Sequence, residues 1–431
     1  MRVRRGGAFG RLWWSMMSAY LADALVWTAA PLLAVRLTQD PFAVSAISAA
    51  SYLPWLLFGV AAGVAADRFD RRRLLGVANV ARAGVVLGAA ALAAAGRMPV
   101  WGLVVLIFVA GVLETVAEEG NQALLPRVVE PSGRDAANSR VVAGTQVAQG
   151  LVAPSAAAAL VAVAAAAPFV VSGVAFAAAA VLALLLPRTT AARTEAVPRA
   201  PRGGFFRQLD DGARFLWRDR PLRTLLLVTT GSATCLTLAQ AALVVFVVRT
   251  LHVPDALVGV FLAVGALGSV AASALLAPAV RRIGRPWVLA GAGLVCGPPL
   301  VVFGVVPGSR AGVVVGAVAY ATMSLGVAVW NSLTVSVRQH RVPDDLLGRV
   351  SGTWRTVCWV LVPLVTLAGG ALARVDLRLP LVLGGVLATI LAVLTARPVV
   401  RAVAAATDGG AAGPADDDAG AGQPELVGAV P

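Results

Sequence analysis

The stretch GVAADRFDRRRLLG at residues 63–76 gathers six charged side chains in a chain that is otherwise strongly apolar. Only 13% of the 431 residues are charged, 58% are hydrophobic, and the mean hydropathy is +0.82. Since a soluble domain is only about 45–50% apolar, the chain lacks the polar residues needed to cover a soluble surface. The composition therefore predicts a membrane protein, in which this charged stretch is a wet turn between two buried segments.

Uncharged or nearly uncharged runs recur on both sides of the turn, and each is long enough for a spanning helix of about 20 residues. Twelve such runs lie at 13–35, 42–66, 74–95, 99–117, 141–163, 166–186, 224–248, 256–280, 287–306, 311–333, 350–373 and 379–396. The sequence thus predicts an all-α polytopic membrane protein with twelve transmembrane helices.

The longest polar interruption divides these helices six and six. We expect an N-terminal six-helix bundle at 1–187, a cytoplasmic linker at 188–223, a C-terminal six-helix bundle at 224–397 and a disordered cytoplasmic tail at 398–431. The second part of the linker, FFRQLDDGARFLWRDRPLR, alternates apolar and charged residues at helical spacing. That pattern is typical of an amphipathic helix on the inner membrane face.

The two halves also repeat each other. NQALLPRVVEPSGRDAANSRVVAGTQVAQGLVAP begins at Asn121, and NSLTVSVRQHRVPDDLLGRVSGTWRTVCWVLVP begins at Asn331. Each segment crosses a basic loop and ends at a proline about midway down the next helix, at Pro154 and Pro363 respectively. Parallel six-helix repeats with a site between them are typical of secondary transporters. We expect hinges at these two prolines and at Gly150.

All 36 basic residues are arginines, and their distribution predicts the orientation of the chain. With the N-terminus inside, 28 arginines fall on the cytoplasmic side and six on the other. This asymmetry follows the positive-inside rule for a multi-pass protein of a bacterial-type plasma (inner) membrane with both termini cytoplasmic. The positive charge then serves orientation and contact with anionic lipid headgroups, so we expect membrane lipid rather than nucleic acid as its partner.

The opening stretch resembles the loop signature between helices 2 and 3 of the major facilitator superfamily. GVLETVAEEGNQALLPRVV and VSVRQHRVPDDLLGRV resemble the branch of that superfamily with enterobactin exporter-like and macrolide efflux-like proteins. The resemblance covers about 11–397. It implies two pseudo-symmetric bundles and a cytoplasmic gate motif at Gly63, Asp67, Arg68, Arg71 and Arg72. In this family pattern Asp67 pairs with an arginine and docks near Ser351 and Gly352.

The family's antiporter signature in helix 5 is only partly present. QGLVAPSAAAAL keeps Gly150 and Pro154 but has Ala153 and Ala156 where the signature has glycine. Antiport therefore does not follow directly from the resemblance.

Charges inside the runs are candidates for coupling transport to protons, because a carboxylate buried in a bundle is costly and usually functional. Asp23 lies near the middle of the membrane, about 16 Å along its helix at 1.5 Å per residue. Arg82 and Glu114 lie at similar depths, so we predict that they pair, either as a static structural pair or as a proton-sensitive switch. Asp23 could instead be a hydrogen-bonded structural residue. We expect Arg355 to extend towards the interface, and Glu118 to be solvated at a helix end.

Amphipathic and polar residues on the helices that usually face the cavity of this family suggest a roomy, weakly polar substrate site. They are Tyr20, Trp27, Gln146, Gln149, Trp330, Asn331 and Trp359.

The predicted function is proton-coupled efflux of a hydrophobic small molecule, such as a drug, natural product or siderophore, by a monomer using alternating access. Import or uniport by the same fold remains open, as does a non-transporting sensor or scaffold. An enzyme would need a wet catalytic cluster, and the predicted outer loops are short and nearly featureless. The three cysteines fall inside runs and the two histidines stand alone, so we expect no metal, cofactor or catalytic residues. An ATP-driven pump is disfavoured because the GxxxxGK[ST] loop is missing from the sequence.

Overall fold

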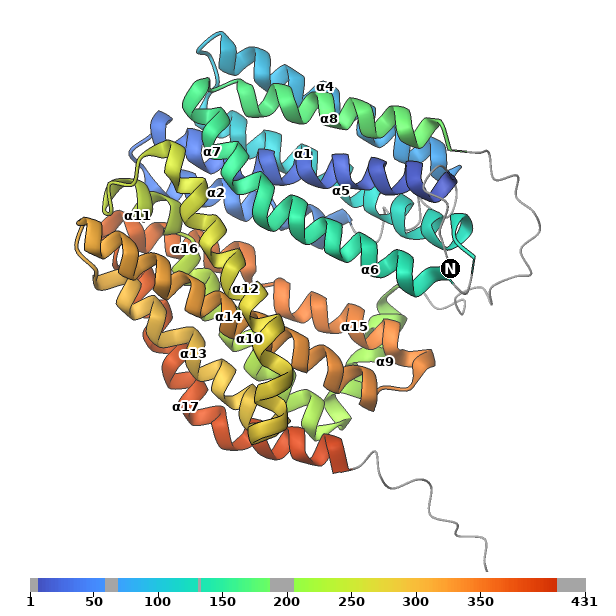
Figure 1. Ribbon diagram of the computed structural model, residues 1–431, viewed down its shortest axis with the longest axis vertical. Helices are drawn as coiled ribbons and strands as arrows, with labels where there is room; N and C mark the ends of the chain where they lie inside the picture. The colour runs from blue at the N-terminus through green and yellow to red at the C-terminus, as the bar shows by residue number, and fades with distance from the viewer. Residues whose placement is uncertain (1–6, 59–68, 131–132, 187–204, 409–431) are drawn as a thin grey trace, which may run out of the picture.

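The computed structural model describes residues 7–58, 69–130, 133–186 and 205–408, and every regular element in these ranges is helical (Figure 1). The first half contains α1 (Ala8–Leu37), α2 (Pro41–Ala50), α4 (Arg71–Ala94), α5 (Val100–Val128), α6 (Arg134–Thr145), the π-helix η2 (Gln146–Val152), α7 (Ala153–Val163) and α8 (Ala167–Leu184). The second half contains α9 (Phe205–Arg218), α10 (Arg220–Gln240), α11 (Leu243–Arg249), α12 (Asp255–Ile283), α13 (Arg285–Val305), α14 (Arg310–Arg341), α15 (Asp344–Trp359), α16 (Val362–Val375) and α17 (Leu379–Asp408).

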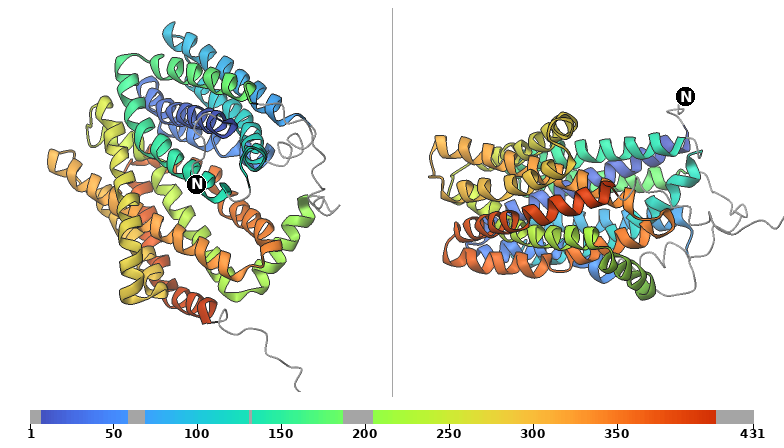
Figure 2. Two further views of the ribbon diagram at one scale, coloured as in Figure 1. Left: turned by 45° about the vertical axis from the view of Figure 1, so that its right-hand side comes forward. Right: turned by 90° about the horizontal axis from the view of Figure 1, so that it is seen from below.

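The described residues contain twelve helices, some built from two or three elements, that are long and apolar enough to cross a membrane. The predicted fold class, an all-α protein with twelve spanning helices in two bundles, is therefore confirmed. Two further views show the bundles side by side with their helices running in roughly the same direction (Figure 2).

The two bundles meet at one end of the molecule, which we call the closed end. There α7 packs on α12, and α2 packs on α16. Both crossings require glycine: a Cβ on Gly259 would lie 2.0 Å from the carbonyl oxygen of Pro154, and one on Gly370 would lie 2.5 Å from the side chain of Ser45. At the opposite end, where α1 begins, α6 and α15 lie apart from each other (Figure 1). We call this the open end.

Irregular helices occur at matching positions of the two halves. In the fifth spanning helix the π-helix η2 contains Gly150 and ends just before Pro154. In the eleventh, α15 ends at Trp359 and α16 starts at Val362, with Pro363 in its first turn. Since proline removes a backbone donor and single-turn π-helices often lie at functional sites, the three predicted hinge residues lie where the backbone departs from an α-helix. Their role as hinges stays a prediction.

The charged stretch between helices 2 and 3 begins α4. Asp70 is the N-cap, and its side chain accepts a hydrogen bond of 2.8 Å from the backbone N–H of Arg73. Arg72 donates to the carbonyl oxygen of Leu184, so it ties α4 to the last turn of α8. Gly63, Asp67 and Arg68 of the predicted gate motif lie outside the described residues. Arg71 occupies the first turn of α4.

The linker helix and the tail differ from their predictions in detail. The expected amphipathic helix is present as α9. It was predicted to lie on the membrane surface, but its Leu216 is fully buried in the protein core of the second half. Gly212 makes this possible, because a Cβ there would lie 2.7 Å from the carbonyl oxygen of Arg349 in α15. Residues 398–408, predicted to be disordered, continue α17, since Val399 and Val403 are buried in the same core.

Candidate functional site

A central cavity with two lobes lies between the bundles. The lobe on the first half has a volume of about 540 Å³ and is lined by α1, α2, α5, η2 and neighbouring residues. The lobe on the second half has a volume of about 690 Å³ and is lined mainly by α10, α14 and α15. Tyr52, Arg355 and Trp359 line both lobes. Tyr52 and Trp359 meet edge to face with ring centroids 6.2 Å apart, so an aromatic pair from opposite halves separates the lobes.

Six of the seven residues predicted to face a cavity line this one. Tyr20, Trp27 and Gln149 line the first lobe, Trp330 and Asn331 the second, and Trp359 both. Gln146 is exposed and lines neither lobe. The reason is the π-helix: it holds more residues in each turn than an α-helix, so residues three apart no longer share a face.

Two charged residues line the cavity although the sequence suggested other positions for them. Glu118, expected at a solvated helix end, accepts hydrogen bonds from the Tyr20 hydroxyl at 2.7 Å and from Gln122 Nε2 at 3.2 Å. Arg355, expected to reach towards the interface, lies in the cavity wall. The cavity-facing position of Glu118 could have been predicted from its spacing. Glu114, Glu118 and Gln122 recur every four residues and therefore share a face of α5.

Arg82 pairs with Asp23 and not, as predicted, with Glu114. Its guanidinium donates to Asp23 Oδ1, and also to Asn79 Oδ1 at 3.3 Å. The guanidinium carbon lies 4.2 Å from the ring centroid of Phe176 in α8. Arg82 is 1% exposed and Asp23 3%. This ion pair is therefore sealed between α1, α4 and α8, and neither of its residues lines the cavity.

Glu114 lies between the sealed ion pair and the cavity. It lines the first lobe but is 9% exposed, and among the described residues its Oε2 has no hydrogen-bond partner. The carboxylate is within electrostatic reach of both Asp23 and Arg82. A buried carboxylate without full hydrogen bonding is costly, so it is a candidate for a group that gains and loses a proton.

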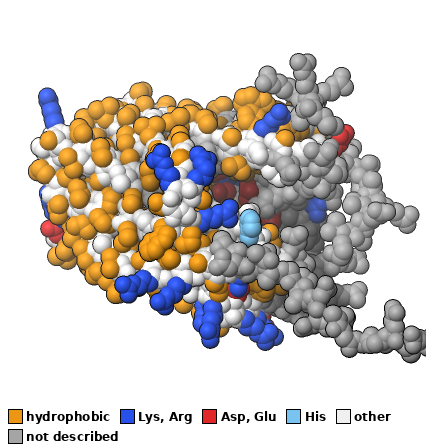
Figure 3. Space-filling view, turned by 60° about the horizontal axis from the view of Figure 1, so that its bottom comes forward, with side chains coloured by type: hydrophobic (Ala, Val, Ile, Leu, Met, Phe, Trp, Pro, Cys, Tyr) orange, Lys and Arg blue, Asp and Glu red, His pale blue; other side chains and the backbone are white. Residues whose placement is uncertain are grey.

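The two walls of the cavity carry charges of opposite sign. Glu114 and Glu118 lie on the wall of the first half, whereas Arg338 and Arg355 lie on that of the second half. Arg338 stacks on the ring of Trp354 with the guanidinium carbon 4.5 Å from its centroid. A space-filling view shows acidic side chains recessed between arginines (Figure 3). This arrangement can attract the halves towards each other and can orient a polar group of a bound molecule. The described residues contain no group of three metal-ligating side chains.

Arginines from the second half hold the closed end together. Arg374 donates from Nε and from a terminal nitrogen to the two carboxylate oxygens of Asp40, at 2.7 and 2.5 Å. Arg249 donates to the carbonyl oxygens of Gln39 at 2.8 Å and Thr38 at 2.5 Å, just after α1. The hydrogen bonds from Arg374 hold the pKa of Asp40 below its ordinary value of 3.8. The pair is therefore ionised at neutral pH.

We expect Asp40→Asn to weaken the closed end, because it removes the charge that Arg374 binds. The lowered pKa means that the wild-type pair contributes fully above pH 3.8 and is lost only as the pH falls through the lower value. Accessibility of a cysteine placed at Ser48 to a water-soluble thiol reagent from the closed end is the measurement. It should rise in the variant at pH 7, where the wild-type pair is ionised and wild type stays protected. Equal protection in both would contradict this role of the pair.

Comparison with known proteins agrees with the fold. The family model of the Major Facilitator Superfamily matches residues 12–366. Uncharacterized MFS-type transporters of Mycobacterium tuberculosis and Mycobacterium bovis are each 33% identical over 129 residues, which is 30% of this chain and 27% of either relative. The match thus spans about a quarter of the length of these relatives. The narrower resemblance to enterobactin exporter-like and macrolide efflux-like proteins stays a prediction.

Solved structures of similar fold cover nearly the whole chain at low identity. A mutant of the nucleoside transporter NupG has a TM-score of 0.72 at 10% identity, over 91% of this chain and 99% of that one. A bacterial homologue of the iron transporter ferroportin in an inward-facing state gives 0.68 at 17%, over 92% and 100%. A bacterial homologue of the human lysosomal transporter Spinster, also inward-facing, gives 0.69 at 14%, over 95% and 98%. The chain belongs to the Major Facilitator Superfamily and has the fold of a membrane transporter.

Proposed function

We propose that this protein is a proton-coupled secondary transporter that exports a hydrophobic small molecule by alternating access. In this proposal the open end faces the cytoplasm of a bacterial cell, both termini are cytoplasmic, and the monomer is the working unit. The excess of arginines in the segments at that end supports this orientation. Export is favoured over import by the family branch that the sequence resembles.

The observation that carries the proposal is the position of Glu114, buried beside an ion pair and open on one side to the cavity. Protonation of Glu114 would remove a negative charge near Asp23 and Arg82, and would thereby change the attraction between charges on the two cavity walls. A ligand in the cavity and a proton on Glu114 would then favour different conformations, which is the requirement for coupling.

The aromatic lining supports a hydrophobic substrate. Trp27 and Trp359 offer large apolar surfaces, while Gln149 and Asn331 can each hydrogen-bond one polar group. Each lobe, at about 540 or 690 Å³, falls within the range of about 300–1,000 Å³ of small-molecule sites. Their apolar and polar groups together resemble other small-molecule sites, in which a few polar groups orient an otherwise apolar ligand.

Transport by purified protein in proteoliposomes tests this proposal. The probe is a panel of lipophilic fluorescent dyes, measured with a pH gradient of either sign and with no gradient. Accumulation of a dye on the side with the higher proton concentration supports proton antiport. Accumulation on the opposite side would show symport and overturn export, whereas equal equilibration under every gradient would show uniport.

A further inference from the structure

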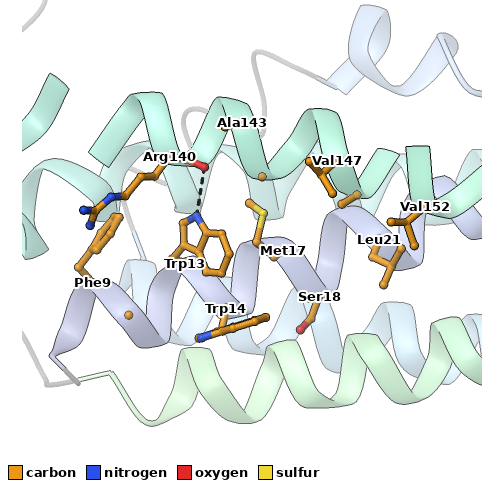
Figure 4. Close-up of a pocket in the computed structure, with 13 residues that line it drawn as sticks. Phe9, Trp13, Trp14, Met17, Ser18, Leu21, Arg140, Ala143, Val147 and Val152 are labelled. Carbon is orange, nitrogen blue, oxygen red and sulfur yellow. Dashed lines mark hydrogen bonds between the residues drawn. The ribbon is translucent and has the colours of Figure 1, made fainter. Parts of the chain in front are cut away.

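A groove of about 840 Å³ runs along the outside of the first half, between α1 and the wall formed by α6 and η2 (Figure 4). It shares no lining residue with either lobe of the central cavity. Trp14, Val147 and Val152 line it and are 59%, 54% and 42% exposed. The groove is therefore open to the surroundings of the bundle, which in a membrane are lipid.

The groove exists because small side chains line two helices that are held at a fixed spacing. Gly144 touches α1 so closely that a Cβ there would lie 2.4 Å from the sulfur of Met17. The indole N–H of Trp13 donates to the carbonyl oxygen of Arg140 at 3.3 Å, which joins the two helices a turn further on. Next to these contacts, the methyl side chains of Ala143 and Ala148 are too small to fill the space between the two helices, and this space is the groove.

The shape and chemistry of the groove change along its length. Its lining on α1 extends from Phe9 to Leu21, which corresponds to about 18 Å at 1.5 Å per residue. One leaflet of a bilayer core is about 15 Å deep, half of about 30 Å. Arg140 lies beside Phe9 at the end nearest the start of α1, whereas Leu21 and Val152 form the apolar far end (Figure 4).

Charged and aromatic groups gather at the Arg140 end. Arg140 is exposed, and Arg11 is exposed on the neighbouring turn of α1, where it donates to the carbonyl oxygen of Leu185 at 2.9 Å. Trp13 and Trp14 pack edge to face with centroids 4.8 Å apart. Tryptophan prefers the boundary between headgroups and acyl chains. This end therefore has the positive charge and the aromatic rings expected at the level of lipid headgroups.

We propose that the groove binds one phospholipid with an anionic headgroup. Its phosphate lies at Arg140, where the guanidinium can donate two hydrogen bonds, and an acyl chain runs past Trp14 to Leu21 and Val152. Positive charge at one end and apolar lining over one leaflet match an amphiphile rather than a free polar solute. The site is separate from the transport cavity and does not depend on the direction of transport.

Native mass spectrometry of the full-length protein in detergent tests the site. Phosphatidylglycerol and phosphatidylcholine are added in equal amounts, and the first bound lipid is counted. Wild type should retain phosphatidylglycerol preferentially. In Arg140→Gln the preference should fall about fivefold, which corresponds to about 1 kcal/mol for one arginine near an anionic surface. Ala143→Trp should fill the groove and remove the first bound lipid of either kind.

Matched controls separate the groove from general attraction between lipid and arginine. Arg401→Gln removes an exposed arginine of α17, and Val174→Trp adds a ring to an outward-facing position of α8 that is 60% exposed. Both should behave as wild type. An equal loss in Arg401→Gln, unchanged binding in Ala143→Trp, or no preference in wild type would each overturn the proposal.

Discussion

Glu114→Gln is expected to abolish transport driven by a pH gradient. Glutamine has nearly the same size and can still hydrogen-bond, but it cannot exchange a proton with the cavity. In proteoliposomes, dye movement under a pH gradient should fall to the rate measured without a gradient. Movement down the dye's own gradient should persist, because the other residues that line the cavity are unchanged.

The matched control is Glu130→Gln, the same substitution at an exposed residue near the open end. It should keep the full response to the gradient. Glu114→Asp, which retains a titratable group, should recover part of the response. If Glu114→Gln kept the wild-type response, Glu114 would have no part in coupling. If Glu114→Gln instead lost dye movement both with and without a pH gradient, Glu114 would be needed for the conformational change itself rather than for proton exchange.

The helices were predictable because lipid demands the same length of apolar sequence from every spanning segment. The break between halves was equally visible, since the arginine-rich linker interrupts that pattern. The tail was harder to predict. Residues 398–408 lie beyond the last apolar run, yet α17 continues through them because Val399 and Val403 have a protein surface to pack on. Hydropathy alone does not report such a surface.

The partner of Arg82 could not be predicted for a geometric reason. Counting residues along a helix gives depth in the membrane, but it does not give the direction in which a side chain leaves the helix. Asp23 and Glu114 lie at similar depths to Arg82, and it is the packing of both α1 and α4 on α8 that brings Asp23 to the guanidinium. Gln146 fails for a related reason, because the π-helix rotates it away from the face that Gln149 occupies.

Arg82→Met is expected to cause the largest loss of stability among the substitutions considered. It keeps much of the volume of the side chain but leaves the Asp23 carboxylate, 3% exposed, without its ion-pair partner. Removing one partner of a buried pair typically costs about 3–5 kcal/mol, more than the pair itself contributes. Thermal unfolding of the protein in detergent should therefore begin at a clearly lower temperature than in wild type.

The double variant Asp23→Asn with Arg82→Met tests whether the ion pair is purely structural or takes part in proton coupling. Without either charge, the buried site no longer carries an uncompensated ion, so stability should recover to near that of wild type. Arg401→Met, the same change at an exposed arginine, should leave unfolding unchanged. A double variant that is stable and still responds to a pH gradient would show that the pair only joins α1 to α4. A stable double variant without that response would make the pair part of the proton-sensitive machinery around Glu114, since fold and cavity would both be intact.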